Sequence, residues 1–199
     1  MNNFPTSVPT VEKKILHPGE YHVARHPAVL STLLGSCVSV CLYDPAIRLI
    51  GMNHFLLATQ HPAAESILES DAGRYGMGAM ELLINSMLKK GARRERLRAK
   101  AFGGGNVLAT HLEDLPARFS IGKINMEFVQ RYLREDGIPL VAQDLGGSIG
   151  RHIRFESEDY SVYMRRIPIR SAAQIAVKEK HYFEKELKTQ QEKKNVDFW

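Results

Sequence analysis

The sequence predicts an α+β domain in which strands and helices form layers. Short runs rich in Val, Ile, Phe and Tyr, which are typical of strands, recur along the chain. Between them lie two longer segments whose apolar residues repeat at helical spacing. Strands mixed with two well-defined helices indicate an α+β or mixed α/β layered arrangement.

The chain is long enough, at 199 residues, for one domain with a real core plus tails. Residues 1–15 are polar and contain two prolines, so we expect a flexible N-terminal arm. The folded domain is expected over residues 16–167. Residues 168–199 are charged and Gln-rich, which predicts a basic C-terminal tail that is partly helical or disordered. Because this tail lacks a periodic apolar face, we expect the chemistry not to need it.

The elements are predicted in order from these patterns. A first helix should end at Gly91, because Lys89 and Lys90 place cations in its last turn and glycine stops it. A second helix should end at Gly137. The expected elements are one or two short strands in residues 16–30, strands over 38–43 and 49–57, a loop over 58–70, a helix over 74–90, a strand over 97–102, a helix over 121–136, a strand over 138–143, and a closing hairpin of 151–155 with 160–167.

The hairpin of residues 38–57 is predicted to bring a cysteine against a histidine. Its centre, Asp44-Pro45-Ala46-Ile47, suits a four-residue loop built around a type I turn. With that loop Tyr43 faces Arg48, and Cys37 then faces His54. Cross-strand partners have Cβ atoms about 4.5–5.5 Å apart, so a thiol and an imidazole could meet. A slip of one residue would place them on opposite faces.

The composition is that of an ordinary globular protein, with 44% hydrophobic and 25% charged residues. No apolar run reaches the ~18 residues of a membrane span, and the first residues do not have the pattern of a secretory signal. We therefore expect a cytoplasmic protein without membrane insertion.

The net charge of +5 is concentrated near the C-terminus. From Arg165 to Trp199 there are nine basic and five acidic residues, and the rest of the chain is nearly neutral. An uneven charge of this size argues against nucleic acid as a partner.

The two cysteines, Cys37 and Cys41, are predicted to be free thiols. Four residues along one strand separate their Cα atoms by ~13 Å, and a disulfide needs less than about 7 Å. Free thiols fit a reducing compartment. No further Cys or His pair stands at ligand spacing, so the sequence predicts neither a metal nor a cofactor.

Cys37 and His54 are the candidate reactive pair. Cys37 follows Gly35-Ser36 at the entry of a strand, where flexible backbone can present N–H groups and expose a side chain. Cys41 lies deeper between apolar neighbours, which indicates a core residue. A close imidazole can take the thiol proton, so we expect the pKa of Cys37 to be unusually low.

Two further roles complete the candidate site. A third polar group normally orients the imidazole, and the nearby hydroxyls are those of Ser31 and Thr32. A tetrahedral oxyanion needs N–H donors, which the backbone at Ser36 and Cys37 can supply.

The run Gly103-Gly-Gly-Asn106 is not a dinucleotide fingerprint, because Leu108 stands where the third glycine should be. A tight turn, or a close backbone approach to a substrate strand, is the better interpretation.

Several of these segments together resemble the CheD family, the chemoreceptor glutamine deamidases of bacterial chemotaxis. The resemblance spans about residues 16–167. The matching stretches are Leu34-Gly-Ser-Cys-Val-Ser-Val-Cys-Leu-Tyr-Asp-Pro45, Gly51-Met-Asn-His-Phe55, Ala101-Phe-Gly-Gly-Gly-Asn106, Ile121-Gly-x-x-Asn125 and Asp144-Leu-Gly-Gly147. It implies a layered sandwich of mixed β-sheets with flanking helices, similar to the deamidating-toxin-like Cys hydrolases.

The resemblance also implies an activity and its residues. The family converts glutamine side chains of methyl-accepting chemotaxis receptors to glutamate, without a cofactor. Its nucleophile falls on Cys37 and its general base on His54. Its third catalytic position, often Thr, falls on Ser31, with Thr32 one residue away as the alternative. A CheC-like phosphatase is a further partner that the resemblance suggests. The competing hypothesis is a non-catalytic adaptor that binds receptors or such a phosphatase.

Overall fold

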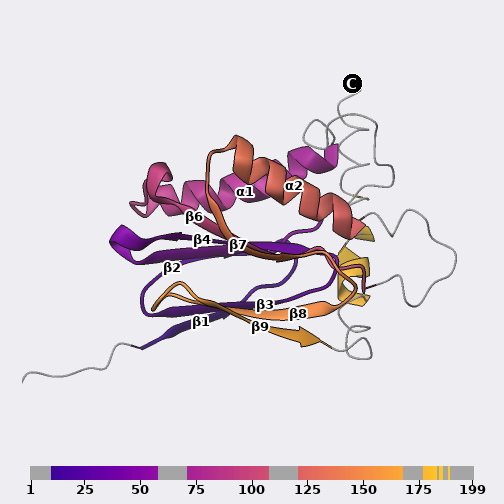
Figure 1. Cartoon of the computed structure of the whole chain (residues 1–199), viewed down its shortest axis with the longest axis horizontal. Coiled ribbons are helices and arrows are strands. Elements are labelled where there is room, and N and C mark those ends of the chain that lie inside the picture. Colours follow the sequence, from indigo (N-terminus) through magenta and orange to yellow (C-terminus); the bar gives the residue numbers. More distant parts are fainter. Residues whose placement is uncertain are drawn as a thin grey trace, which may run out of the picture.

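The computed structural model describes residues 10–57, 71–107, 121–167, 177–182, 184, 185 and 188. Two β-sheets lie face to face, and two helices cover the outer face of one of them (Figure 1). The order of layers is therefore helix, sheet, sheet. This arrangement confirms the predicted layered mixture of strands and helices.

The sheet next to the helices has five strands in the order β2-β5-β4-β6-β7. Its neighbours are antiparallel except for β6 and β7, which run parallel. The strands are β2 (Tyr21–Arg25), β4 (Val38–Asp44), β5 (Leu49–Asn53), β6 (Arg98–Gly103) and β7 (Leu140–Leu145).

The second sheet has four strands in the order β1-β3-β8-β9. The pairs β3–β8 and β8–β9 are antiparallel, and β8–β9 is the predicted closing hairpin. The strands are β1 (Glu12–Ile15), β3 (Ala28–Leu34), β8 (Gly150–Glu156) and β9 (Val162–Ile167).

Strand β1 corrects the predicted N-terminal arm, which was expected to extend through residue 15. Residues Glu12–Ile15 instead pair in parallel with β3 at the edge of the sheet. The sequence gives no strand pattern here because most side chains of this edge strand are exposed, so no apolar alternation is required. Residues 1–9 of the arm lie outside the described residues, as does the loop predicted over 58–70.

The two helices confirm the helical patterns. Helix α1 (Asp71–Lys89) contacts β5 and β2, and α2 (Ile121–Glu135) contacts β4, β6 and β7. Gly91 follows α1 with φ of 96°, a left-handed conformation that ends the helix at low cost. The buried stripes comprise Met80, Leu83, Ile84 and Met87 of α1 and Ile124, Phe128, Val129, Tyr132 and Leu133 of α2. Each large apolar side chain buried in this way contributes roughly 1.5–3 kcal/mol.

A second core fills the space between the two sheets. It contains Cys37 and Cys41 together with Leu30, Leu34 and Met52. Both cysteines are fully buried and free. The interior between the sheets is therefore where the predicted thiol site lies.

The predicted hairpin exists, but its register differs from the expectation. Asp44 pairs with Leu49 and Tyr43 with Ile50, so Tyr43 does not face Arg48. The loop is a short 3-10 helix, Pro45–Ile47, followed by Arg48 in a left-handed conformation with φ of 50°. Arg48 thus belongs to the turn, and the pairing shifts by two residues. Because side chains alternate with a period of two, this shift keeps every side chain on its predicted face.

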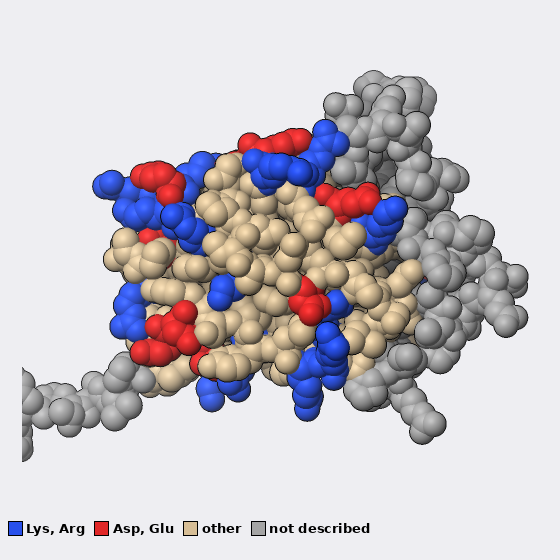
Figure 2. Space-filling view, viewed as in Figure 1, with Lys and Arg blue, Asp and Glu red and all other residues tan. Residues whose placement is uncertain are grey.

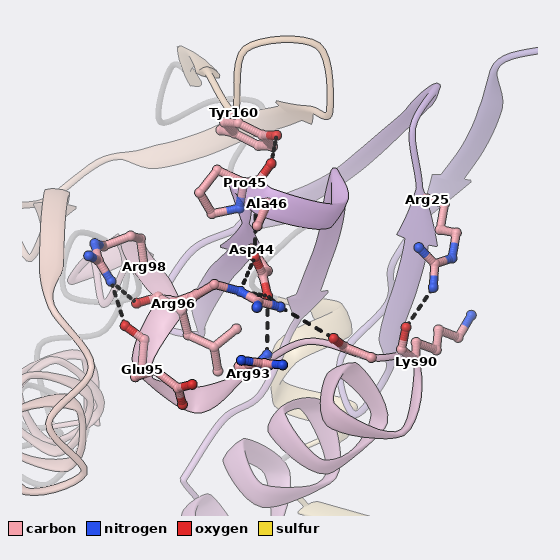
Figure 3. Close-up of polar contacts among 12 residues, drawn as sticks. Arg25, Asp44, Pro45, Ala46, Lys90, Arg93, Glu95, Arg96, Arg98 and Tyr160 are labelled. Carbon is pink, nitrogen blue, oxygen red and sulfur yellow. Dashed lines mark hydrogen bonds and ion pairs between the residues drawn. The ribbon is translucent and has the colours of Figure 1, made fainter.

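Asp44 fixes the hairpin turn to the segment that precedes β6 (Figure 3). Its carboxylate is buried and accepts the N–H groups of Ala46 and Arg93. Arg96 forms an ion pair with it at 2.7 Å. Burial favours a higher pKa for Asp44, but the hydrogen bonds from Arg96 and the backbone outweigh it, so the pKa is lowered. The carboxylate therefore joins the turn to the segment between α1 and β6.

One face of the molecule has mixed charge. Figure 2 shows Lys and Arg interspersed with Asp and Glu on the face drawn there, so neither sign gathers into one patch on that face. None of the described helices combines the length and the apolar character needed to cross a membrane.

Candidate active site

Cys37 lies at the point where the chain passes from one sheet to the other. Strand β3 ends at Leu34 in the four-stranded sheet, and β4 begins at Val38 in the five-stranded sheet. Residues Gly35–Cys37 make the crossing and are buried. Their N–H groups are therefore not used in a strand ladder and are available to the site.

The glycine loop after β6 supports this crossing. The N–H of Gly104 donates to the carbonyl oxygen of Cys37 at 2.7 Å, and that of Gly105 donates to Gly35 at 2.7 Å. Gly103 has φ of 108°, and a Cβ atom there would lie 2.2 Å from the carbonyl oxygen of Cys37. The close backbone approach predicted for this loop is thus to the chain's own Cys37 segment.

Asn125 of α2 holds the crossing from the other side. Its Nδ2 donates to the carbonyl oxygen of Ser36 at 3.0 Å. Its Oδ1 accepts the N–H of Leu57 at 2.8 Å. The side chain is fully buried and uses both ends of its amide, so it fixes Ser36 relative to the chain after β5.

His54 follows β5 and is only 2% exposed. Its Nδ1 lies 2.8 Å from the hydroxyl oxygen of Thr32. The same hydroxyl donates its single hydrogen to the carbonyl oxygen of Leu16 at 2.8 Å. Nδ1 must therefore carry the proton and donate to Thr32, which leaves Nε2 unprotonated. Nε2 is buried and has no hydrogen-bond partner among the described residues.

The structure places Thr32, not Ser31, beside His54. Thr32 is buried on the face of β3 that meets the other sheet, whereas Ser31 is half-buried on the opposite face. Neighbouring residues of a strand point to opposite faces, so only one of these hydroxyls can reach the imidazole. Of the two hydroxyls predicted for the third position, the structure therefore brings the alternative, Thr32, and not Ser31 into contact with His54.

Cys37 and His54 do come together. The Sγ atom of Cys37, a ring nitrogen of His54 and a carboxylate oxygen of Glu179 all lie within 4.8 Å of one another. In the observed register Val38 pairs with Phe55, so the thiol and the imidazole are diagonal neighbours on one face, not direct partners. The predicted loop has the observed length of four residues but begins one residue too early, which shifts the pairing by two residues. Because two is an even number, both side chains stay on the same face and the predicted proximity remains.

Glu179 is the residue that the sequence did not reveal. It belongs to the helical residues 177–182, drawn in yellow at one end of the two sheets in Figure 1. Its Oε1 accepts the N–H groups of Gly35 at 2.8 Å and Cys37 at 3.2 Å. Its Oε2 accepts the N–H of Ser36 at 2.8 Å and the Ser36 hydroxyl at 2.6 Å. One glutamate in a charged tail has no signal that would distinguish it from a solvated side chain.

The protonation of the pair follows from its burial. Burial raises the pKa of the Cys37 thiol well above its ordinary value, and the Glu179 carboxylate raises it further. This is opposite to the expected acidic thiol. Burial lowers the pKa of His54 to about 4, against the opposing effect of Glu179. In this structure a neutral thiol therefore faces a neutral imidazole.

The trio of Cys37, His54 and Glu179 also offers the sulfur, nitrogen and oxygen donors that zinc accepts. The carboxylate oxygens, however, already accept four hydrogen bonds from the crossing. A metal ion would have to displace those bonds. The arrangement fits an acid–base pair beside a set of N–H donors better than it fits a metal site.

Comparison with known proteins finds relatives that cover most of the chain. The family model described as CheD chemotactic sensory transduction matches residues 56–166. A protein of Shewanella oneidensis, named "Probable chemoreceptor glutamine deamidase CheD 2", is 49% identical over 149 residues, which are 75% of this chain and 74% of the relative. A protein of Geobacter sulfurreducens, named "Probable chemoreceptor glutamine deamidase CheD 1", is 44% identical over 185 residues, covering 92% of this chain and 91% of the relative.

Among solved structures, the hypothetical protein YfiH of Bacillus licheniformis matches 64% of this chain and 49% of its own, with 17% identity and a TM-score of 0.37. A score at this level carries no conclusion about function. The family model and the sequence relatives show that the chain belongs to the CheD family.

Proposed function

We propose that this protein deamidates glutamine side chains of methyl-accepting chemotaxis receptors, producing glutamate and ammonia. The observation that supports this most directly is the meeting of a thiol, an unpartnered imidazole nitrogen and a set of backbone N–H donors in one buried site. The named relatives are chemoreceptor glutamine deamidases, and this chain covers most of their length.

The reaction is a hydrolysis in two steps. Nε2 of His54 takes the proton of Cys37, and the thiolate attacks the carboxamide carbon of the substrate glutamine. The resulting C–O⁻ is stabilised by the N–H groups of Gly35, Ser36 and Cys37, which already hold carboxylate oxygens in this structure. His54 returns the proton to the amide nitrogen, the C–N bond breaks, and ammonia leaves.

The thioester that remains is opened by water. His54 removes a proton from the water as it attacks, the C–S bond breaks, and the thiol is restored. Thr32 acts as a positioning residue, because its hydroxyl accepts a hydrogen bond from Nδ1–H and keeps Nε2 unprotonated. The net change is one water consumed, one ammonia released, and one new carboxylate on the receptor.

A cytoplasmic location belongs to the same proposal, since both cysteines are free thiols and such thiols persist in a reducing compartment. The CheC-like phosphatase stays a prediction from the resemblance.

The test is to incubate the purified protein with receptor cytoplasmic domains and to follow intact mass and ammonia release. We expect the mass gain of an NH₂-to-OH exchange at glutamine, together with an equal amount of ammonia. Binding to the receptor without either product would support the adaptor hypothesis and contradict the enzyme.

A further inference from the structure

The carboxylate of Glu179 has the chemistry of the product that the proposed reaction makes. A deamidated receptor glutamine is a glutamate, whose side chain has the same length and the same terminal group as Glu179. In this structure that group accepts hydrogen bonds from Gly35, Ser36 and Cys37, the donors assigned above to the substrate oxygen. The hydroxyl of Ser36 adds a further bond at 2.6 Å.

A second contact fixes the same helix to the domain. Tyr182 lies three residues after Glu179, so both side chains emerge from one helix face. Its ring packs against Gly19, where a Cβ atom would lie 2.7 Å from the tyrosine oxygen. Its hydroxyl bonds to that of Tyr75 in α1. The opposite charges of Lys180 and Glu184 pair on the exposed side at 3.8 Å. The helix that carries Glu179 is therefore held against the domain by Tyr182 as well.

Glu179 in this position prevents catalysis. The N–H groups that would hold a substrate oxygen are occupied, and the side chain is only 2% exposed. A carboxylate beside Cys37 also disfavours the thiolate that must attack. A catalytic role for Glu179 would require its oxygens to be free to accept a proton, whereas the crossing saturates them.

Building on the proposed function, we propose that the C-terminal helix is a built-in product analogue. Glu179 occupies the site of the receptor's side-chain carboxyl group, and it must withdraw before a receptor glutamine can enter. The intact chain is thus self-inhibited, and receptor segments compete with residue 179 for the same donors.

The sharpest test makes residue 179 a substrate. In Glu179→Gln the new side chain is nearly isosteric and carries a carboxamide to the position of the product. We expect Cys37 to deamidate it, so that peptide mapping finds glutamate at position 179 of a chain encoded with glutamine. The double variant Cys37→Ala with Glu179→Gln should keep the amide. Glu184→Gln, on the exposed side of the same helix, should keep it too.

A second measurement tests the inhibition. Glu179→Ala should deamidate receptor domains faster than the unchanged chain, by about tenfold if one molecule in ten is open at rest. Glu184→Ala should match the unchanged chain. A thermal unfolding curve for each variant shows whether it is folded. If Glu179→Ala does not fold, the conversion of residue 179 in Glu179→Gln tests the proposal by itself.

The outcomes separate this inference from the proposed function. If the receptor is deamidated but residue 179 is never converted in Glu179→Gln, the product-analogue interpretation is overturned and the enzyme stands. A lower rate of receptor deamidation in folded Glu179→Ala would also overturn this interpretation, because it would show that the glutamate assists the reaction. If no variant deamidates either the receptor or residue 179, the proposed function itself fails.

Discussion

The hydroxyl oxygen of Thr32 accepts a hydrogen bond from Nδ1–H of His54, with the two heavy atoms 2.8 Å apart, and this contact determines which imidazole nitrogen is free. Because the hydroxyl hydrogen is used on Leu16, the tautomer cannot reverse without breaking a buried bond. Nε2 is left as the unprotonated nitrogen, and it has no partner among the described residues. The contact acts on the chemistry only through His54, so its removal should affect the rate without removing the base.

Thr32→Val is expected to lower kcat/KM by about tenfold, since losing one buried hydrogen bond costs roughly 1–3 kcal/mol. Thr32→Ser keeps the hydroxyl and should restore most of the rate. The matched control is Ser31→Ala, whose side chain lies on the other face of β3 and should leave the rate unchanged. The pH profile of each variant reports whether His54 itself is altered. A large loss in Ser31→Ala would contradict this placement.

The two cysteines should differ completely in function. Cys37→Ala removes the nucleophile and should abolish deamidation, measured by the mass of the receptor domain. Cys41→Ala leaves a small cavity between the sheets and should lower stability while much of the activity remains. Equal activity of Cys37→Ala and the unchanged chain would end the assignment of the nucleophile.

The sequence was sufficient for the parts of the fold that depend on periodicity. The stripes of α1 and α2 follow from apolar spacing, because a helix must bury one face. The pattern predicts the hairpin but not its register, since the four-residue turn begins at Pro45 and ends at Arg48, and no residue preference indicates a left-handed conformation at Arg48. Cys37 and His54 are close in spite of this difference, because a register shift of two residues leaves both side chains on the same face.

Glu179 has no signal along the chain that would predict its place in the site. It is separated from Cys37 by more than a hundred residues, and its contacts are to backbone N–H groups, which every residue other than proline carries. Charge patterning placed it on a solvated tail. Only the folded arrangement shows that a buried set of donors requires an acceptor, and that this glutamate supplies it.

Labelling of Cys37 with iodoacetamide should report the effect of the Glu179 carboxylate on the thiol. Burial and Glu179 raise the pKa of Cys37, so the thiol should label slowly at neutral pH in the unchanged chain. In Glu179→Ala it should label faster at the same pH. Cys41, whose pKa is also raised by burial, should label slowly in both proteins. Peptide mass spectrometry resolves the two sites, and fast labelling of Cys37 in the unchanged chain would contradict the structure.

The glycine loop should be intolerant of a side chain at one position. In Gly103→Ala the new Cβ would lie 2.2 Å from the carbonyl oxygen of Cys37, and the backbone has a φ that favours glycine. We expect a lower unfolding temperature and loss of most deamidation. Gly78→Ala in α1 is the control, because nothing lies within 4 Å of its added Cβ and alanine favours a helix. If Gly103→Ala retained full activity, the loop would not be what positions Cys37.

Stability should fall as the pH is lowered through the window set by His54. Its pKa is about 4 in the folded protein against an ordinary value of 6.5, so the unfolded chain binds the proton more tightly. Stability is therefore fully present above pH 6.5 and is lost as the pH falls toward 4, by up to about 3 kcal/mol. Urea unfolding at several pH values measures this slope.

In His54→Gln the slope between pH 6.5 and 4 should decrease, because the titrating group has been removed. His181→Gln is measured beside it as a matched substitution of an exposed histidine. Asp44 does not obscure the comparison, since its lowered pKa means that its contribution is lost only below about 3.8. The partly buried His152 contributes equally to all three proteins. An unchanged slope in His54→Gln would show that the imidazole is already solvated, and the buried, neutral base that the mechanism requires would be contradicted.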